Sequence, residues 1–165
     1  MLITAGMPAP DFQGIDDAGA VRRLMDYRGE DFVLYFYPAD DTSGCTKEAC
    51  HFRDDFSEYQ KAGVSILGVS PDPVKSHAKF KTKYQLPFPL LADEDHKICE
   101  AYGVWGPKKL MGREYEGVIR TTFLINKQGV IAHVFENVLP SEHSAEVLET
   151  IKTMIEKPIG KRSLK

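Results

Sequence analysis

Two short and almost continuous apolar runs restrict the fold of this chain more than any other feature. Phe32 to Tyr37 is a β-branched and aromatic run that Pro38 ends, and Val64 to Val69 is a second run of the same kind. A strand with one face in water alternates apolar and polar residues, whereas a strand buried on both faces is apolar along its length. Strands of that kind belong to parallel sheets covered by helices, so the two runs predict an α/β fold.

Helical patterns and shorter strands follow in an order that predicts a mixed central sheet flanked by helices. We predict helices over Ser43 to Lys61, Val74 to Tyr84, Asp95 to Tyr102 and Ser141 to Lys157, the last with Ser141 as its N-cap. We predict further strands at Leu90-Leu91, Val118 to Ile125 and Val130 to Phe135, hairpin turns at Asp16 to Gly19 and Asn126 to Gly129, and a turn at Gly103 to Gly106.

The length and composition are those of one globular domain. No repeat, low-complexity stretch or Gly/Ser-rich linker divides the 165 residues, so we predict a single domain over 1–165 with a flexible basic tail over about 158–165. A formal charge of −3 gives no indication of a nucleic-acid or anionic-membrane partner. The N-terminus has no secretory-signal pattern and no apolar run is long enough to span a bilayer, so we expect a soluble, cytoplasmic protein.

Cys45 lies directly after the first apolar run, where sheets of this kind usually bind their ligands. It falls about two residues inside the start of the predicted helix, with Ser43 as candidate N-cap. Unpaired N–H groups and the helix dipole stabilise an anion there, which favours a nucleophilic thiolate over a thiol. Thr42 can hold its hydroxyl beside the sulfur or the oxygen that the sulfur attacks. We therefore predict that Cys45 is reactive rather than a space-filling buried cysteine.

Cys50 follows Cys45 by five residues, and Thr46 to Ala49 between them contain no Gly or Pro. In an intact helix the Cα atoms of residues i and i+5 lie about 8.6 Å apart, whereas a disulfide needs less than about 7 Å. The two cysteines can therefore bond only if the first turns of the helix unwind. We predict a wound form with two thiols and a locally unfolded form with a disulfide.

Zinc binding is the main alternative for this cysteine pair, because its spacing is within the range of zinc ligands and His96 and Cys99 offer two more. Zinc knuckles, however, present cysteines from tight turns, whereas Thr46 to Ala49 favour a helix. Cys99 lies beside apolar neighbours and is predicted to fill the core. A cysteine hydrolase would need a histidine base, and His51 is predicted to point elsewhere on the helix.

The segment Phe36-Tyr37-Pro38-x-x-x-Thr42-x-x-Cys45 resembles the peroxiredoxin signature Pro-x-x-x-Thr/Ser-x-x-Cys, and the spacing to Cys50 is similar to the bacterioferritin comigratory protein, or PrxQ, branch. The resemblance extends over most of the chain. It includes Gly6-x-Pro8-x-Pro10-Asp11-Phe12, Gly68-Val69-Ser70-Pro71-Asp72, Leu91-Ala92-Asp93, Gly103-Val104-Trp105-Gly106 and Arg120-Thr121-Thr122-Phe123-Leu124-Ile125.

This resemblance implies a thioredoxin-like fold with the N-terminal hairpin addition of peroxiredoxins, and the reduction of hydrogen peroxide and organic hydroperoxides. Cys45 matches the peroxidatic cysteine and Cys50 the resolving one. Some members of the branch carry the resolving cysteine on the next helix, and the absence of a cysteine from Val74 to Tyr84 supports Cys50.

Three other positions match family residues around the sulfur. Thr42 matches the residue that hydrogen-bonds the peroxide, and Arg120, in a predicted strand, matches the arginine beside the sulfur. Pro38 shields the sulfur and shapes the loop, and Glu48 is a candidate to orient the arginine. Taken alone, an arginine in a strand is more often a surface residue, so the role of Arg120 rests on the resemblance.

The predicted cycle needs no metal, haem or flavin. Cys45 becomes a sulfenic acid, forms a disulfide with Cys50, and is reduced by a dithiol protein such as thioredoxin. The resemblance to the branch also suggests a monomer. Two alternatives stay open: a general thiol–disulfide oxidoreductase, which would prefer a C-x-x-C pair, and a non-enzymatic domain stabilised by zinc.

Overall fold

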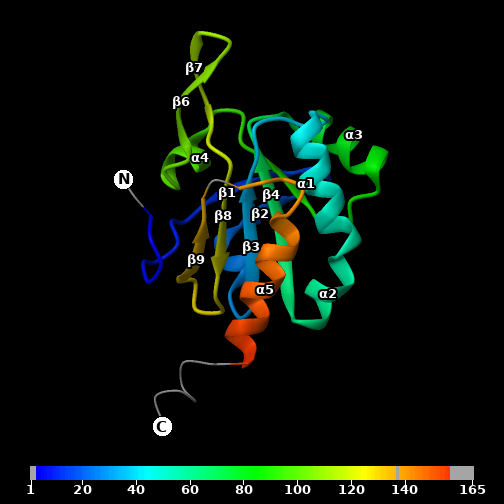
Figure 1. Ribbon diagram of the computed structural model, residues 1–165, viewed down its shortest axis with the longest axis vertical. Helices are drawn as coiled ribbons and strands as arrows, with labels where there is room; N and C mark the ends of the chain where they lie inside the picture. The colour runs from blue at the N-terminus through cyan, green and yellow to red at the C-terminus, as the bar shows by residue number, and fades with distance from the viewer. Residues whose placement is uncertain (1–2, 137, 157–165) are drawn as a thin grey trace.

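The computed structural model describes residues 3–136 and 138–156. These residues form a seven-stranded sheet and a separate two-stranded ribbon that projects beyond it (Figure 1). The strand order in the sheet is β2 (Val21–Arg23), β1 (Gln13–Asp16), β5 (Leu90–Ala92), β4 (Val64–Ser70), β3 (Asp31–Phe36), β8 (Thr121–Ile125) and β9 (Ile131–Phe135). The ribbon consists of β6 (Trp105–Leu110) and β7 (Arg113–Val118).

The two apolar runs form the centre of the sheet, as predicted. β3 pairs with β4 in parallel and β4 with β5 in parallel, whereas the outer pairings are antiparallel. From Phe32 to Phe36, each residue of β3 is at most 1% exposed, which is the burial expected of a strand covered on both faces. The predicted mixed central sheet is confirmed.

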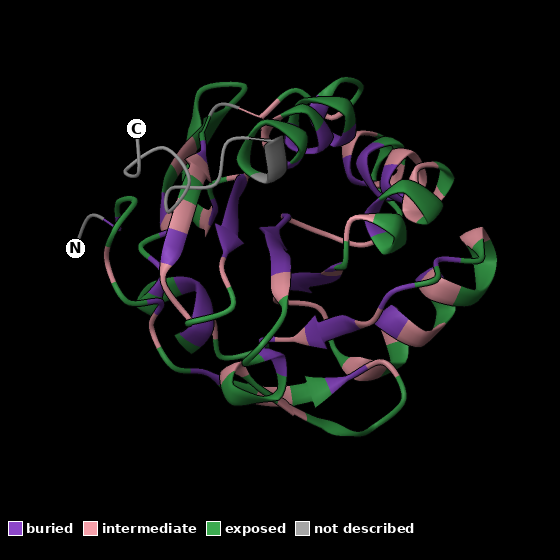
Figure 2. Cartoon of the chain, turned by 90° about the horizontal axis from the view of Figure 1, so that it is seen from below, coloured by how far each residue is buried: buried purple, intermediate pink, exposed green. Residues whose placement is uncertain are grey.

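Alternate residues of β3 enter two separate cores, one on each side of the sheet. Val33 and Tyr35 pack with residues of α1 (Ser43–Asp54), α2 (Phe56–Lys61), α3 (Val74–Tyr84) and α5 (His143–Glu156). Phe32 and Leu34 pack on the other side with residues of α4 (Lys97–Ala101) and the 3-10 helix η1 (Leu24–Tyr27). Figure 2 shows the buried strands passing between these helical layers.

Three of the predicted helices have other limits. The helix predicted from Asp95 to Tyr102 is shorter and corresponds to α4, Lys97–Ala101. The helix predicted from Ser43 to Lys61 is divided at Asp55, which ends α1 and precedes α2. The carboxylate of Asp55 accepts a hydrogen bond from Ser144 Oγ at 2.8 Å, a tertiary contact that local sequence does not reveal. The last helix begins at His143, so the N-cap prediction for Ser141 is wrong, and Lys157 lies outside the described residues.

The segment after α4 differs most from prediction. The single strand predicted from Val118 to Ile125 is divided by Ile119 and Arg120, and the turn predicted at Gly103 to Gly106 leads instead into β6. Pro107 lies inside β6, a residue that argues against a central strand but is tolerated in an edge ribbon.

The chain ends can be compared with prediction in part. The N-terminal hairpin is confirmed, because β1 and β2 pair across Asp16 to Gly19 in an antiparallel register. The basic tail over about 158–165 falls outside the described residues. Within the described ranges, no helix combines the length and apolarity needed to cross a membrane.

Candidate active site

Cys45 is placed at the carboxyl edge of the central sheet. β3 ends at Phe36, a loop follows, and α1 begins directly after Thr42, which makes Cys45 the third residue of the helix. Thr42, not Ser43, is the N-cap residue, and its carbonyl accepts the first helical hydrogen bond from Thr46 N–H at 2.8 Å. Cys45 therefore lies in the first turn, where N–H groups lack intrahelical partners and partial positive charge stabilises an anion.

Arg120 brings a positive charge to the sulfur from a distant part of the chain. It lies in the two-residue break between β7 and β8, and its predicted location in a strand is wrong. The antiparallel register of β8 on β3 pairs Thr121 with Phe36, so Arg120 emerges at the edge of the sheet that leads to Cys45. Its Nη2 donates a hydrogen bond to Cys45 Sγ at 3.1 Å. Cys45 is 1% exposed, so little water screens this contact.

Glu48 holds the other side of the same guanidinium. Its Oε1 accepts a hydrogen bond from Arg120 Nη1 at 2.6 Å, and its side chain is fully buried. Burial raises the pKa of Glu48 to about 7, although Arg120 acts in the opposite direction. Burial lowers the pKa of Arg120, but attraction to Glu48 and Cys45 outweighs it, so the net shift is upward. Arg120 thus stays charged and bridges a carboxylate and a sulfur.

Thr42 and Pro38 lie in the same loop, but neither is hydrogen-bonded to the sulfur in the described residues. The Thr42 hydroxyl donates to the carbonyl oxygen of Ala39 at 3.0 Å, and the residue is exposed. Because the hydroxyl hydrogen is donated to Ala39, the hydroxyl oxygen can act as an acceptor for a donor outside the loop. Pro38 is half-buried at the end of β3.

Cys50 lies on α1, half-buried, and is not bonded to Cys45. Burial raises the pKa of its thiol. The helix is continuous between the two cysteines, so the structure corresponds to the wound form with two thiols. Cys99 is fully buried, and burial followed by its contact with Asp93 raises the pKa of its thiol well above the usual range. Its predicted place in the core is confirmed.

A buried polar network, which sequence reasoning missed, fixes the loop before α1. The Asp40 carboxylate accepts hydrogen bonds from Tyr37 Oη at 2.6 Å and Ser76 Oγ at 2.7 Å, and it contacts His77 Nδ1 at 2.8 Å. The Asp40 N–H donates to Asp72 at 2.7 Å. The partners come from the loop after β3, from α3 and from the loop after β4, so only the tertiary structure brings them together.

The metal alternative finds little support around the cysteines. Asp40, Asp72 and His77 form the one group of three potential metal ligands within the described residues, and it excludes Cys45 and Cys50. Its carboxylates are already engaged by hydroxyl, N–H and imidazole groups. The imidazole of His96, offered as a zinc ligand, stacks on Trp105 at 3.9 Å between ring centroids.

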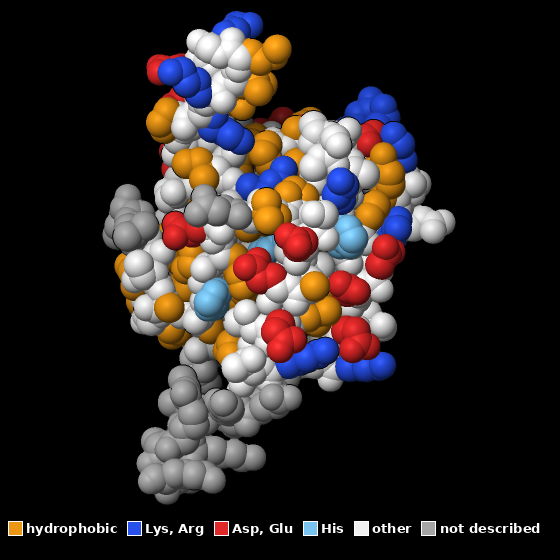
Figure 3. All heavy atoms as spheres, in the orientation of Figure 1, with side chains coloured by type: hydrophobic (Ala, Val, Ile, Leu, Met, Phe, Trp, Pro, Cys, Tyr) orange, Lys and Arg blue, Asp and Glu red, His pale blue; other side chains and the backbone are white. Residues whose placement is uncertain are grey.

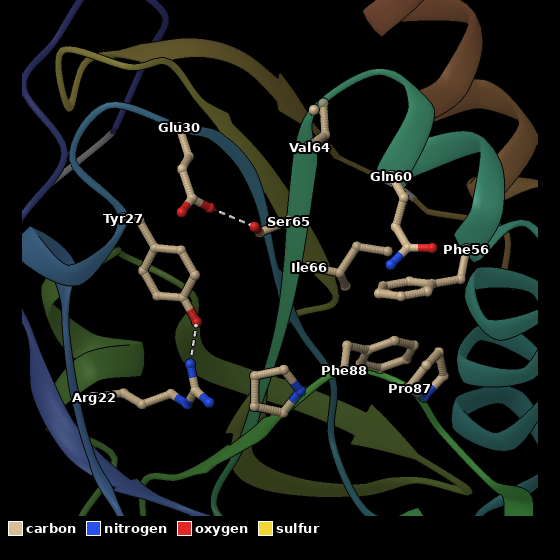
Figure 4. Close-up of a pocket in the computed structure, with 12 residues that line it drawn as sticks. Arg22, Tyr27, Glu30, Phe56, Gln60, Val64, Ser65, Ile66, Pro87 and Phe88 are labelled. Atoms are coloured by element: carbon tan, nitrogen blue, oxygen red, sulfur yellow. Dashed lines mark hydrogen bonds between the residues drawn. The ribbon is translucent and has the colours of Figure 1, made fainter.

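A pocket of about 480 Å³ lies at the opposite end of the sheet (Figure 4). Glu30 precedes β3, and Val64 and Ser65 begin β4, so the pocket is at the amino edge of these strands, away from Cys45. Four of its polar side chains bond one another in pairs: Ser65 donates to Glu30, and Arg22 donates to Tyr27. None of its lining residues is a cysteine or a histidine, so we place the reactive site at Cys45.

Comparison with known proteins identifies the family of the chain. Residues 5–134 match the model of the AhpC/TSA family. The chain is 51% identical over 148 residues to a putative peroxiredoxin bcp of Coxiella burnetii, covering 90% of this chain and 98% of that protein. It is 48% identical over 157 residues to the peroxiredoxin Bcp of Bacillus subtilis, covering 95% and 100%.

Solved structures give the same result. A PrxQ mutant of Xylella fastidiosa superimposes with a TM-score of 0.89 at 30% identity, covering 94% of this chain and 99% of that one. A peroxiredoxin Q mutant of Xanthomonas campestris superimposes with a TM-score of 0.85 at 36% identity, covering 91% of this chain and 98% of that one. The predicted thioredoxin-like fold is thereby confirmed. The family match and the identity to these relatives show that the chain belongs to the AhpC/TSA family and is a thiol-dependent peroxidase of the Bcp/PrxQ group.

Proposed function

We propose that Cys45 is the peroxidatic cysteine and Cys50 the resolving cysteine of this peroxidase. The observation that carries the proposal is the hydrogen bond of 3.1 Å from Arg120 Nη2 to Cys45 Sγ in the first turn of α1. Two sources of positive charge, the guanidinium and the helix N-terminus, stabilise a thiolate at this buried position. A thiolate is the form of cysteine that attacks peroxide.

In the first step, the Cys45 thiolate attacks the terminal oxygen of a hydroperoxide. The sulfur–oxygen bond forms as the oxygen–oxygen bond breaks, Cys45 becomes a sulfenic acid, and the leaving alkoxide takes up a proton to become an alcohol, or water from hydrogen peroxide. Arg120 stabilises the negative charge as it moves from sulfur to the leaving oxygen. Thr42 accepts a hydrogen bond from the peroxide O–H, and Pro38 limits the access of water.

In the second step, the Cys50 thiol attacks the Cys45 sulfenic acid, and a disulfide and one water molecule form. The Cα atoms of residues i and i+5 in a helix lie about 8.6 Å apart, so α1 must unwind locally before this bond forms. Helix ends open more easily than buried strands, which supports opening at the first turns of α1.

In the third step, a dithiol protein returns both cysteines to thiols. One thiolate of the reductant attacks the Cys45–Cys50 disulfide and forms a mixed disulfide with one of the two cysteines. The second thiol of the reductant then attacks this mixed disulfide, so the peroxidase is released with both thiols and the reductant is left with a disulfide. We propose hydrogen peroxide and organic hydroperoxides as substrates and thioredoxin or a similar protein as reductant. We also propose that the chain acts as a cytoplasmic monomer, one domain over 1–165.

Mass mapping after one equivalent of peroxide tests the assignment of the cysteines. We expect a Cys45–Cys50 link in the wild type, a sulfenic acid at Cys45 in Cys50→Ser, and no peroxide consumption by Cys45→Ser. Cys99→Ala is the matched control and should form the same link as the wild type, because Cys99 is buried on the other face of the sheet. Wild-type consumption by Cys45→Ser would overturn the proposal. Insulin reduction with negligible peroxide turnover would favour a general thiol–disulfide oxidoreductase.

A further inference from the structure

The β6–β7 hairpin separates its side chains by chemistry onto two faces. In an antiparallel pair, opposed residues project to the same side, and the side alternates along the strand. The inner face, as we name it, comprises Gly106, Lys108, Leu110, Arg113, Tyr115 and Gly117. The outer face comprises Trp105, Pro107, Lys109, Glu114, Glu116 and Val118. The inner face thus has two basic and two large apolar side chains and no acidic one, whereas both glutamates of the hairpin lie on the outer face.

The inner face lies on the side of Cys45. A Cβ atom built on Gly106 would meet Ile119 Cδ1 at 3.2 Å, so this face continues into Ile119, the neighbour of Arg120. The Lys108 ammonium donates to the Val118 carbonyl at 2.7 Å, and burial and Arg120 lower its pKa while Cys45 acts to raise it. Lys108 is therefore within electrostatic range of the reactive sulfur.

Large apolar side chains remain in water along this path. Leu110 is 62% exposed, Tyr115 45% and Ile119 45%. Pro140 lies close to the start of α1, because a Cβ atom built on Gly44 would contact it at 3.5 Å. Its neighbour Leu139 is 61% exposed. Figure 3 shows apolar side chains on the projecting hairpin and around its base. An apolar surface with basic groups therefore extends from the hairpin to the helix that carries Cys45.

The size of this surface fits a protein better than a peroxide. A strand rises about 3.3 Å per residue, so six residues extend roughly 17 Å, well beyond the few atoms of a hydroperoxide at the sulfur. The whole chain has a formal charge of −3, so a negatively charged partner is repelled overall and gains attraction only locally. A face with Lys108, Arg113 and no carboxylate provides that local attraction.

We propose that the inner face is the docking surface for the acidic dithiol protein that reduces the Cys45–Cys50 disulfide, an inference that rests on the proposed function. Arg113 and Lys108 attract carboxylates on the partner, and Leu110 and Tyr115 bury their apolar surface against it. Docking there orients the reductant thiolate toward the disulfide at the base of the hairpin, where exchange proceeds as described above.

The test compares two reductants and two charge reversals on full-length protein. Arg113→Glu changes the inner face, and Lys109→Glu makes the same charge change at an exposed position on the outer face. With a thioredoxin of net negative charge, we expect Arg113→Glu to raise the KM for thioredoxin about tenfold and to weaken its salt dependence. Lys109→Glu should stay within about twofold of the wild type, and Leu110→Ser should raise the KM about fivefold.

Turnover supported by dithiothreitol, and the single-turnover rate of Cys45 oxidation by hydrogen peroxide, should be unchanged in all three variants. Equal effects of Arg113→Glu and Lys109→Glu, or no effect of either, would overturn the docking proposal. A slower single-turnover reaction of Arg113→Glu with cumene hydroperoxide would also overturn it, because the inner face would then bind substrate. A wild-type dimer in sedimentation that Arg113→Glu alone dissociates would overturn it as well, because the inner face would then join two copies of the chain. Failure of wild-type Cys45 to react with peroxide would instead overturn the proposed function.

Discussion

At the scale of single residues, Arg120 connects the two buried groups of the site. Its two terminal nitrogens point at different partners, Nη1 at Glu48 Oε1 and Nη2 at Cys45 Sγ. A guanidinium can do this because its N–H groups are held in one plane at fixed angles, whereas an ammonium is a point charge. Glu48 therefore sets the orientation in which Arg120 meets the sulfur, the role the sequence suggested for it.

Arg120→Lys should keep the positive charge and lose the fixed geometry. We expect the second-order rate constant for Cys45 oxidation by hydrogen peroxide to fall about 100-fold, the usual cost of removing one directed donor from a reacting centre. Stopped-flow fluorescence with one equivalent of peroxide measures this constant. Arg28→Lys, at an exposed position, should match the wild type, and an Arg120→Lys variant as fast as Arg28→Lys would contradict the role of Arg120.

At the scale of elements, the proposed cycle requires α1 to hold Cys45 in place during the attack on peroxide and to unwind locally before the disulfide forms. Contacts with α3 secure the segment at both ends. Before the helix, Asp41 accepts hydrogen bonds from Lys83 Nζ at 2.7 Å and Tyr84 Oη at 2.6 Å. Near its end, Arg53 Nη1 donates to the Tyr84 carbonyl at 2.7 Å. Unwinding is therefore expected between these two anchors, which is the stretch that contains both cysteines.

Lys47→Gly should accelerate disulfide formation, because Lys47 is exposed in α1 and glycine lowers helix stability by about 1 kcal/mol. That corresponds to a roughly fivefold larger unwound population and a similar gain in the rate at which the sulfenic acid converts to a disulfide. Rapid quench followed by mass spectrometry gives this rate. Lys79→Gly is the matched change in α3 and should leave the rate unaltered. Equal rates in both variants would argue against unwinding as the limiting event.

At the scale of the whole molecule, Glu48 makes stability depend on pH. Its pKa is about 7 in the folded protein and 4.5 in the unfolded chain, so between these values the folded state binds more protons. The free energy of unfolding therefore falls as pH rises from about 4.5 to 7. At about 1.4 kcal/mol per pH unit, the loss attributable to Glu48 is on the order of 3 kcal/mol.

Glu48→Gln should remove this loss, since an amide does not titrate. Urea unfolding at pH 4.5 and at pH 7 should show a smaller difference between the two pH values in Glu48→Gln than in the wild type. Glu94→Gln, at an exposed position, is the control and should retain the wild-type difference. If the free energy of unfolding of Glu48→Gln falls with pH as much as that of the wild type, Glu48 is ionised throughout this range or relaxes into water.

Much of the architecture follows from local sequence. β3, β4 and α3 lie where the apolar runs and helical pattern predict them, because each is decided by residues next to one another in the chain. The division of the first long helix at Asp55 could not be predicted, since its contact with Ser144 spans 89 residues. The β6–β7 hairpin was missed because Pro107 and the glycines beside it read locally as a turn.

The sequence by itself determined the sheet core, the helix start that carries Cys45 and the five-residue separation from Cys50, because burial pattern, helix geometry and spacing are local properties. Only the tertiary structure decided which groups meet the sulfur. Arg120 is 75 residues from Cys45 and reaches it through the β3–β8 register, and the Asp40–His77 contact joins residues 37 apart. Such contacts depend on how strands pair and helices pack, and no short stretch of sequence encodes that pairing.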